Sequence, residues 1–195
     1  MSKGFTLIEL LIVIAILAIL ATVVVLVLNP ATILAETRDS QRVADLDTIR
    51  SAINLYLATV GGPTLQGGSG FTCGTNFGAD KAGVGESFTG APTISHAGVF
   101  AVDGSGWVAV PLNAFSPTPP IPVLPRDPVT TGTTYYYSYG CNNGSLIYEL
   151  NANMESAKYA STNGTCTAPL NASDKECTDG GDVNTIYEIG TSLAI

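Results

Sequence analysis

Residues 5–28 form an uninterrupted apolar run in which Glu9 is the single ionisable side chain. As an α-helix, these 24 residues would span roughly 36 Å, at a rise of about 1.5 Å per residue. The hydrocarbon core of a bilayer requires only about 20 residues. The run is therefore expected to be a transmembrane helix, with the rest of the chain forming a water-soluble part.

A short leader containing one basic residue, Lys3, precedes this run. An ordinary secretory signal is cut after its apolar core, at a site of small residues. In this chain the small residue, Gly4, stands before the core, so cleavage there would remove only residues 1–4. The apolar helix would then stay on the mature chain as a structural element.

The segment Gly4–Leu10, with the sequence GFTLIEL, resembles the processing site of type IV prepilins and type II secretion pseudopilins. The resemblance is fullest over residues 4–28, extends to about residue 60 and is weak beyond it. It implies that a prepilin peptidase in the membrane cuts after Gly4 and methylates the new amino terminus, Phe5. It also implies a homopolymeric filament that grows at an inner-membrane assembly platform.

Glu9 is the one charged group inside the apolar run. Such a side chain costs about 2.5–3.5 kcal/mol at mid-bilayer on insertion scales, so it persists where it has a partner. Cleavage after Gly4 would create an ammonium group on Phe5, one helical turn away. The resemblance implies that this ammonium meets Glu9 of a neighbouring subunit and sets the axial register. The alternative is an interfacial glutamate that reaches water and has no role in assembly.

The distribution of charge indicates the orientation. Lys3 precedes the span, and the positive-inside rule keeps residues 1–4 in the cytoplasm and exports the head. The helix would contact membrane lipid before assembly, and the head would belong to a periplasmic or extracellular filament. Residues 61–195 hold four basic and eleven acidic residues, a balance of −7. Nucleic-acid binding by the bulk surface of this head is therefore not expected.

The cysteines all lie in the part expected to be exported. An even number there favours two disulfides, whereas the lack of a C-x-x-C pair and the single histidine argue against zinc. Four cysteines allow three pairings. Cys166–Cys177 with Cys73–Cys141 is favoured because the first pair closes a short loop, and four buried free thiols are the alternative.

Asn29-Pro30 interrupts the apolar run, and a kink or short unwound stretch is expected near residues 26–31, because proline disfavours helix at the residue before it. An amphipathic helix should follow and end at Gly61-Gly62-Pro63. Its apolar stripe recurs at three- and four-residue steps, at Val43, Leu46, Ile49, Ile53, Leu57 and Val60. The stripe is expected to pack on a sheet, and a coiled-coil stalk is the alternative.

The predicted domain order is a leader (1–4), an N-terminal helix (5–60, apolar to 28 and amphipathic over 29–60) and a β head (61–195). Residues 61–93 are rich in Gly, Thr and Ser and predict a long connection with little regular structure. Short runs around turn sequences predict two hairpins and one last strand. The strands are expected at 99–102 and 107–110, at 134–139 and 145–150, and at 185–189.

The fold class is therefore α+β and pilin-like, with a long N-terminal transmembrane helix packed on a small antiparallel β-sheet head. Trp107 is expected in the core and His96 in a loop. Tyr135, Tyr137 and Tyr139 share one face of a strand. A half-buried β face is the favoured explanation for them, and an adhesive surface is the alternative.

The segment Leu124–Pro128, with the sequence LPRDP, is similar to a stretch of major type II pseudopilins whose nearby loops hold calcium. Oxygen-bearing side chains in this stretch and in a late acidic loop are the candidate calcium ligands. These are Asp127, Asp174, Asp179 and Asp182. The favoured interpretation of the acidic loop is a solvated segment stapled by Cys177, and no other cofactor is expected.

An enzyme is not expected. The chain lacks G-x-S-x-G, H-E-x-x-H and phosphate-loop motifs, and its single histidine leaves only a Ser–His96 site as an alternative. The favoured function is a structural subunit of a type IV pilus or pilus-like filament. The alternative is a major-type pseudopilin of a type II secretion system, and a membrane-anchored binding module that does not polymerise is a third hypothesis.

Overall fold

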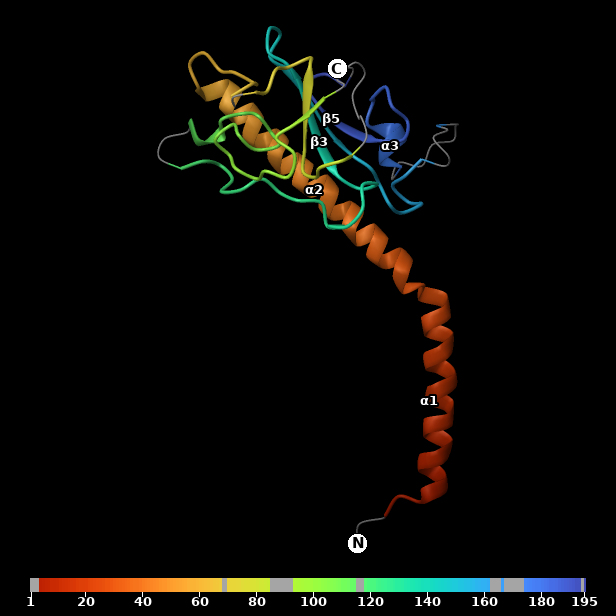
Figure 1. The fold of residues 1–195 in the computed structure, drawn as a ribbon. Coiled ribbons are helices and arrows are strands. Elements are labelled where there is room, and N and C mark those ends of the chain that lie inside the picture. The colour runs from red at the N-terminus through yellow and green to blue at the C-terminus, as the bar shows by residue number, and fades with distance from the viewer. Residues whose placement is uncertain are drawn as a thin grey trace. The chain divides into compact units, whose positions relative to one another are not determined.

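The structure is a computed structural model that describes residues 4–67, 70–84, 93–114, 118–161, 166, 174–193 and 195 (Figure 1). The chain divides into two compact units, Met1–Ala35 and Glu36–Ile195. The first unit contains helix α1 (Leu7–Leu28) and the start of helix α2 (Pro30–Thr59). The second contains the rest of α2 and a β-sheet head.

Helix α1 is apolar on every side, and all of its 22 residues are exposed. It ends at Leu28 because Asn29 adopts a left-handed conformation (φ 38°, ψ 82°) and Pro30 follows. Pro30 is the first residue of α2, a position where its missing N–H and fixed φ are tolerated. The Asn29 carbonyl accepts the first bonds of the new helix, from Thr32 N at 3.0 Å and Ile33 N at 3.4 Å. The expected interruption of the helix therefore lies at Asn29.

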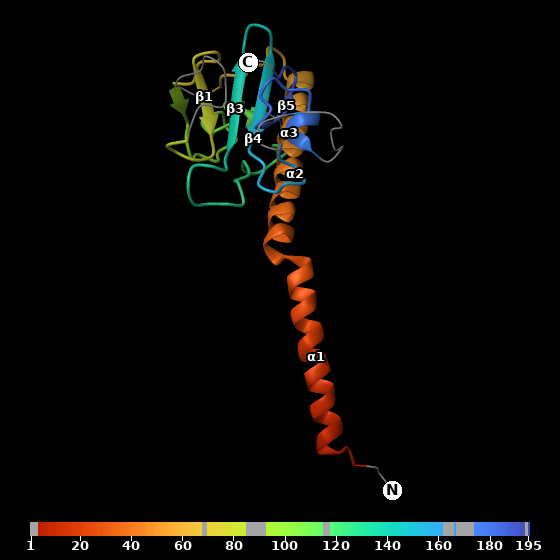
Figure 2. The same cartoon turned by 90° about the vertical axis from the view of Figure 1, so that its right-hand side faces the viewer.

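The head contains a five-stranded sheet in the described part of the chain, with the order β2-β1-β3-β4-β5 (Figure 2). All neighbouring strands are antiparallel except β1 and β2, which are parallel. Their bounds are Asn76–Ala79 (β1), Thr93–Ser95 (β2), Tyr137–Asn142 (β3), Ile147–Ala152 (β4) and Tyr187–Gly190 (β5). The short helices η1 (Leu112–Ala114) and α3 (Lys175–Thr178) complete the described elements. The predicted α+β class is confirmed.

One face of the sheet packs against α2. Leu46, Ile49 and Ile53 of α2 share a buried core with alternate residues of the central strands. On the sheet these residues are Tyr137, Tyr139, Cys141, Tyr148, Leu150 and Ala152. The amphipathic stripe thus packs on the sheet, as the sequence predicts, rather than forming a stalk.

The tyrosines on this face satisfy their hydroxyl groups inside the head. Tyr137 donates to Asp45 Oδ2 at 2.9 Å, and Tyr139 donates to the Leu65 carbonyl at 2.8 Å. Burial raises the pKa of Tyr139 well above its ordinary value. Tyr137 and Tyr139 are therefore core residues with paired hydroxyls, not parts of an adhesive surface. Tyr135 precedes β3, is partly buried and has the Arg42 guanidinium over its ring at 4.9 Å.

The predicted hairpin over residues 99–110 is wrong. Within the described segment 93–114, this region forms only an isolated bridge between Asp103 and Pro111. The four residues from Trp107 to Val110 are all completely buried, which a two-faced strand with one solvated side does not allow. The segment is an irregular layer of the core, held by bonds such as Trp107 N to Val99 O at 2.8 Å. Trp107 is in the core and His96 is in a loop, as predicted.

The segment 61–93 is more regular than its composition suggests, since β1 lies inside it. Gly78 lies within this strand, and because glycine has a low strand propensity, composition alone did not predict β1. A Cβ at Gly78 would collide with the Trp107 carbonyl oxygen, so the close approach of two chain segments requires glycine there. The second predicted hairpin exists as β3 and β4, shifted by two or three residues, and the last predicted strand is β5.

A buried ion cluster ties α2 to two loops of the head. Arg42 is fully buried and donates to both oxygens of Asp127, at 2.7 and 3.2 Å, and to Asp39 at 2.6 Å. Asp39 also accepts the backbone N–H groups of Glu155 at 2.9 Å and Ser156 at 2.7 Å. Each carboxylate is thus shared between the guanidinium and other donors, the arrangement a buried ion pair requires.

Disulfides staple the head in two places. Cys73 pairs with Cys141, which joins the segment before β1 to the end of β3. Cys166 pairs with Cys177 of α3, across a separation of eleven residues. These are the two pairs that the sequence favours, and such crosslinks suit a domain outside the reducing cytoplasm.

We predict that Arg42→Met lowers the free energy of unfolding of the head by about 3–5 kcal/mol, because the buried carboxylates of Asp39 and Asp127 lose the guanidinium, and Asp127 keeps only the longer ion pair with Lys81 at 3.7 Å. The matched control is Arg50→Met. Arg50 pairs with Asp47 at 2.8 Å on the same helix, but both side chains are more than two-fifths exposed, so the expected loss is about 0–1 kcal/mol. Urea unfolding of the full chain in detergent measures both values. Equal losses would show that the cluster contributes no more than a surface pair.

Candidate processing and assembly site

The residues around the predicted cleavage bond form a helix N-terminus. Thr6 is the N-cap of α1, with extended backbone angles (φ −83°, ψ 151°). Its hydroxyl oxygen accepts the backbone N–H of Glu9 at 3.3 Å. In return, Glu9 Oε2 accepts the Thr6 backbone N–H at 2.9 Å and the Thr6 hydroxyl at 2.6 Å. This reciprocal arrangement is a capping box, which the pattern Thr-x-x-Glu favours at the start of a helix.

The capping box gives Glu9 partners within its own chain. Its carboxylate lies in the first turn of α1, where the helix dipole favours negative charge. Glu9 stands out in the sequence, whereas its partner Thr6 was missed, although the spacing of Thr6 and Glu9 is a recognisable signal. In the uncut chain, therefore, the one acid of the apolar helix already accepts two hydrogen bonds.

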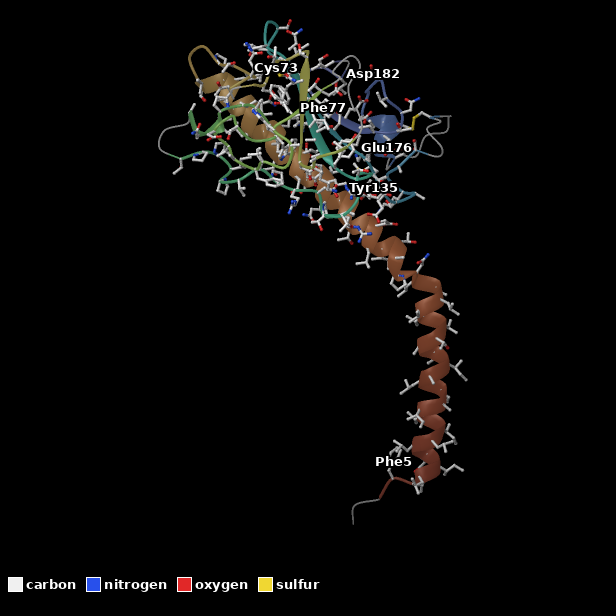
Figure 3. The ribbon with its side chains drawn as sticks, in the orientation of Figure 1. Phe5, Cys73, Phe77, Tyr135, Glu176 and Asp182 are labelled. Atoms are coloured by element: carbon white, nitrogen blue, oxygen red, sulfur yellow. A yellow bond between two sulfur atoms is a disulfide. The ribbon has the colours of Figure 1, made fainter. Side chains whose placement is uncertain are left out.

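Gly4 and Phe5 are accessible to any partner that binds this site. Both are exposed, and the Phe5 side chain is 78% accessible (Figure 3). A Cβ placed on Gly4 would meet no described atom within 4 Å, and its backbone is not left-handed. Nothing in the described chain therefore demands glycine at this position. A requirement for glycine would have to come from a partner that binds here, and residues 1–3 of the leader lie outside the described residues.

Helix α1 needs a cover from outside its own chain. Its large apolar side chains project on all sides (Figure 3), and none of its residues is buried. It is long and apolar enough to cross a membrane. An exposed apolar surface of this extent is stable only in lipid or against other helices.

Three of the four candidate calcium ligands have other roles in the structure or stand in solvent, and the fourth, Asp174, has a buried Oδ1 with no hydrogen-bond partner among the described residues. Asp127 binds Arg42, and Asp179 accepts the backbone N–H groups of Gly181 at 3.0 Å and Glu188 at 2.8 Å. Asp182 is exposed. Among the residues that the structure describes, no three acidic, histidine or cysteine side chains are grouped as a metal site. We therefore identify none of these residues, Asp174 included, as a metal ligand.

A comparison with family models finds one match. Residues 1–25 match the model described as the prokaryotic N-terminal methylation motif. The chain carries the type IV prepilin and pseudopilin signature. Comparisons with curated proteins and with solved structures found no match for the chain.

The prepilin signature covers the leader, the capping box and most of α1. It is the signature of pilins and pseudopilins, which are structural proteins. Together with the exposed apolar surface of α1, it fits a subunit that is anchored in a membrane and then joins a filament. The head adds no further match, so the assignment to this group rests on the first 25 residues.

We predict that Gly4→Ala blocks removal of the leader without disturbing the fold, because an added methyl group has free space within the described chain. The matched control is Gly61→Ala, since Gly61 has equally open surroundings and a backbone that is not left-handed. Mass spectrometry of the membrane-bound protein measures the fraction that is cut. Efficient maturation of the Gly4 variant would contradict the site.

Proposed function

We propose that the chain is a structural subunit of a type IV pilus or pilus-like filament. The observation that carries this proposal is the methylation motif, which runs from the leader into an apolar helix that its own chain leaves uncovered. A prepilin peptidase cuts after Gly4 and methylates the amine of Phe5. The methylated amine keeps its positive charge and stays at the end of α1.

The route to the filament follows from the distribution of charge and apolar surface. Lys3 stays in the cytoplasm, α1 crosses the inner membrane once, and the head lies outside. Lipid covers α1 until an assembly platform transfers the subunit to the filament. There the α1 helices of other copies replace lipid as the cover of the apolar surface.

Glu9 sets the register in this proposal. The ammonium group of Phe5 on an incoming subunit pairs with Glu9 of a subunit already in the filament. In an apolar core, a carboxylate without a cation is strongly disfavoured, and a pair that is also hydrogen-bonded is tolerated. The capping bonds from Thr6 supply those additional hydrogen bonds. Only one axial position of the incoming helix satisfies both charges.

A second candidate function is a major-type pseudopilin of a type II secretion system. The observation that favours it is the segment Leu124–Pro128, which is similar to a stretch of those proteins. Asp127 of this segment holds Arg42 in the buried ion cluster. Deleting the gene distinguishes the two functions: loss of surface fibres supports a pilus, and retention of secreted proteins in the periplasm supports a secretion pseudopilus.

We predict that Glu9→Gln is cut and exported normally but yields at least about tenfold fewer filaments, a factor that corresponds to about 1.4 kcal/mol at each junction between subunits. The variant keeps the shape of the side chain and removes the charge that pairs with the amine. Glu36→Gln is the control, because Glu36 pairs with Lys158 on the surface of the head. Electron microscopy and quantification of sheared fibres measure the yield. A normal yield from Glu9→Gln would rule out the register role.

We also predict that a chain lacking residues 5–28, exported with an ordinary cleaved signal, gives a soluble and monomeric head. The compact unit Glu36–Ile195 contains the sheet, most of α2 and both disulfides. Size-exclusion chromatography with light scattering gives its mass. If this head formed polymers unaided, the assembly element would lie in the head instead of α1.

A further inference from the structure

The face of the sheet opposite α2 carries buried polar side chains. Ser138 of β3, Asn151 of β4 and Glu188 of β5 lie side by side across three strands. Glu149 of β4 is opposite Gly190 and is therefore a diagonal neighbour of Glu188 on the same face. The two glutamates are only 2% and 1% exposed. Two acidic side chains are thus buried next to each other on this face of the sheet.

Each glutamate holds a different C-terminal part of the chain. Glu188 Oε2 accepts the N–H of Val183 at 3.1 Å, and a Cβ on Gly181 would collide with the same oxygen. Residues 179–183 therefore pass directly over the Glu188 carboxyl group. Glu149 Oε2 accepts the N–H of Ile195 at 3.2 Å, and its Oε1 accepts the amide of Asn151 at 2.8 Å.

The surroundings of the remaining oxygen of Glu188 indicate the protonation state of the two glutamates. Oε1 is buried and accepts no hydrogen bond from a described protein donor. The carboxyl groups of Glu149 and Glu188 lie within hydrogen-bonding reach of each other. A carboxylate has only acceptors, so a bond between the two requires that one of them carry a proton. A proton on Glu188 that is donated to Glu149 gives the buried oxygen its missing partner.

Basic side chains lie near the pair, but none of the described ones forms an ion pair with it. Asp179 and Asp182 add negative charge beside the pair, and β3 contributes the neutral Ser138. Arg50 and Lys175 line the neighbouring pocket with Glu188 and Tyr187. Arg50 pairs with Asp47 instead. Among the described residues, no ion pair links Glu149 or Glu188 to a basic side chain, Lys175 included.

We propose that Glu149 and Glu188 share one proton, and that this proton holds residues 179–183 and Ile195 on the outer face of the sheet. The pair and the two segments that it binds form a proton-dependent latch. This inference concerns the head alone and does not depend on the filament function.

The latch opens as the pH rises. Burial and the negative charge of Glu149 raise the pKa of Glu188 to about 8, from an ordinary value of 4.5. A raised pKa means that the folded head binds the proton more tightly than the unfolded chain does. The stabilising effect is complete below the ordinary value and is lost as the pH rises through about 8. Above that pH, two adjacent buried carboxylates repel each other and the segments over them are released.

The test is amide hydrogen exchange of Val183 in the full chain in detergent, expressed as a protection factor so that the intrinsic effect of pH is removed. Between about pH 6 and about pH 9, the ratio of latched to released molecules should fall by roughly a hundredfold, because only the latched state binds the proton in this range. Protection of Val183 follows this ratio and should fall in the wild type by up to about the same factor. In Glu188→Gln, which donates a hydrogen bond without a titrating proton, protection should stay constant.

Glu176→Gln is the matched control. Glu176 is also buried and accepts the backbone N–H groups of Met154 at 3.0 Å and Ser161 at 2.7 Å. Among the described residues no carboxyl group is hydrogen-bonded to it, and Asp174 acts on it only through its charge. Its variant should show the same fall as the wild type. Constant protection in the wild type, or an equal fall in Glu188→Gln, would overturn the latch.

Two further measurements keep the proposal testable if Glu188→Gln does not fold. The carbon-13 shift of the Glu188 carboxyl group in the wild-type chain should titrate near pH 8, and titration in the ordinary range of glutamate would overturn the proposal. Adding calcium or a chelator at about pH 6 should leave the protection of Val183 unchanged. A change would show that a metal ion, rather than a proton, neutralises the pair.

Discussion

Helix α1 is an apolar rod that its own chain leaves uncovered, and this constraint governs the behaviour of the whole molecule. Burying apolar surface is the dominant favourable term in folding and association. The apolar surface of α1 is not buried inside the subunit, since all residues of this helix are exposed. The apolar surface of α1 is therefore available for burial in lipid or against other helices. In the proposed filament, the single acid at Glu9 gives direction to this otherwise non-directional attraction, because a buried charge is tolerated only where its partner is present.

The head solves the opposite problem. It buries its apolar side chains in a core of its own, whereas the residues of α1 are exposed. Its core is formed by α2 and one face of the sheet, and the buried cluster around Arg42 fixes the helix to loops that are distant in sequence. Disulfides close two further connections. The head is thus a self-contained compact unit with its own core.

Sequence reasoning succeeded where the signal is local. The apolar run, the break before Pro30, the hairpin of β3 and β4 and the stripe of α2 all follow from short-range patterns. The capping box of Thr6 and Glu9 was equally local and was overlooked. The prediction failed at residues 99–110, because an apolar run around a glycine turn has the same composition whether it forms a strand or an irregular core layer. Only the fully buried set from Trp107 to Val110 distinguishes the two.

The polar sites of the head lay beyond prediction for a different reason. Arg42 and Asp127 are 85 positions apart, and no spacing rule connects them. The alternation of β4 marks Glu149 and Asn151 as one face, but solvent would be the ordinary environment of such a face. The late segment 179–183 covers it instead. Long-range contacts of this kind decide which acids are buried, and therefore which can respond to pH.

The central claim is that α1 stays on the mature subunit with a methylated amine at its first residue. Top-down mass spectrometry of protein taken from assembled fibres tests it directly. The account predicts a chain that lacks residues 1–4 and carries one additional methyl group on the amine of Phe5. A mature chain that begins beyond Leu28, or one that still carries its leader in the fibre, would contradict it.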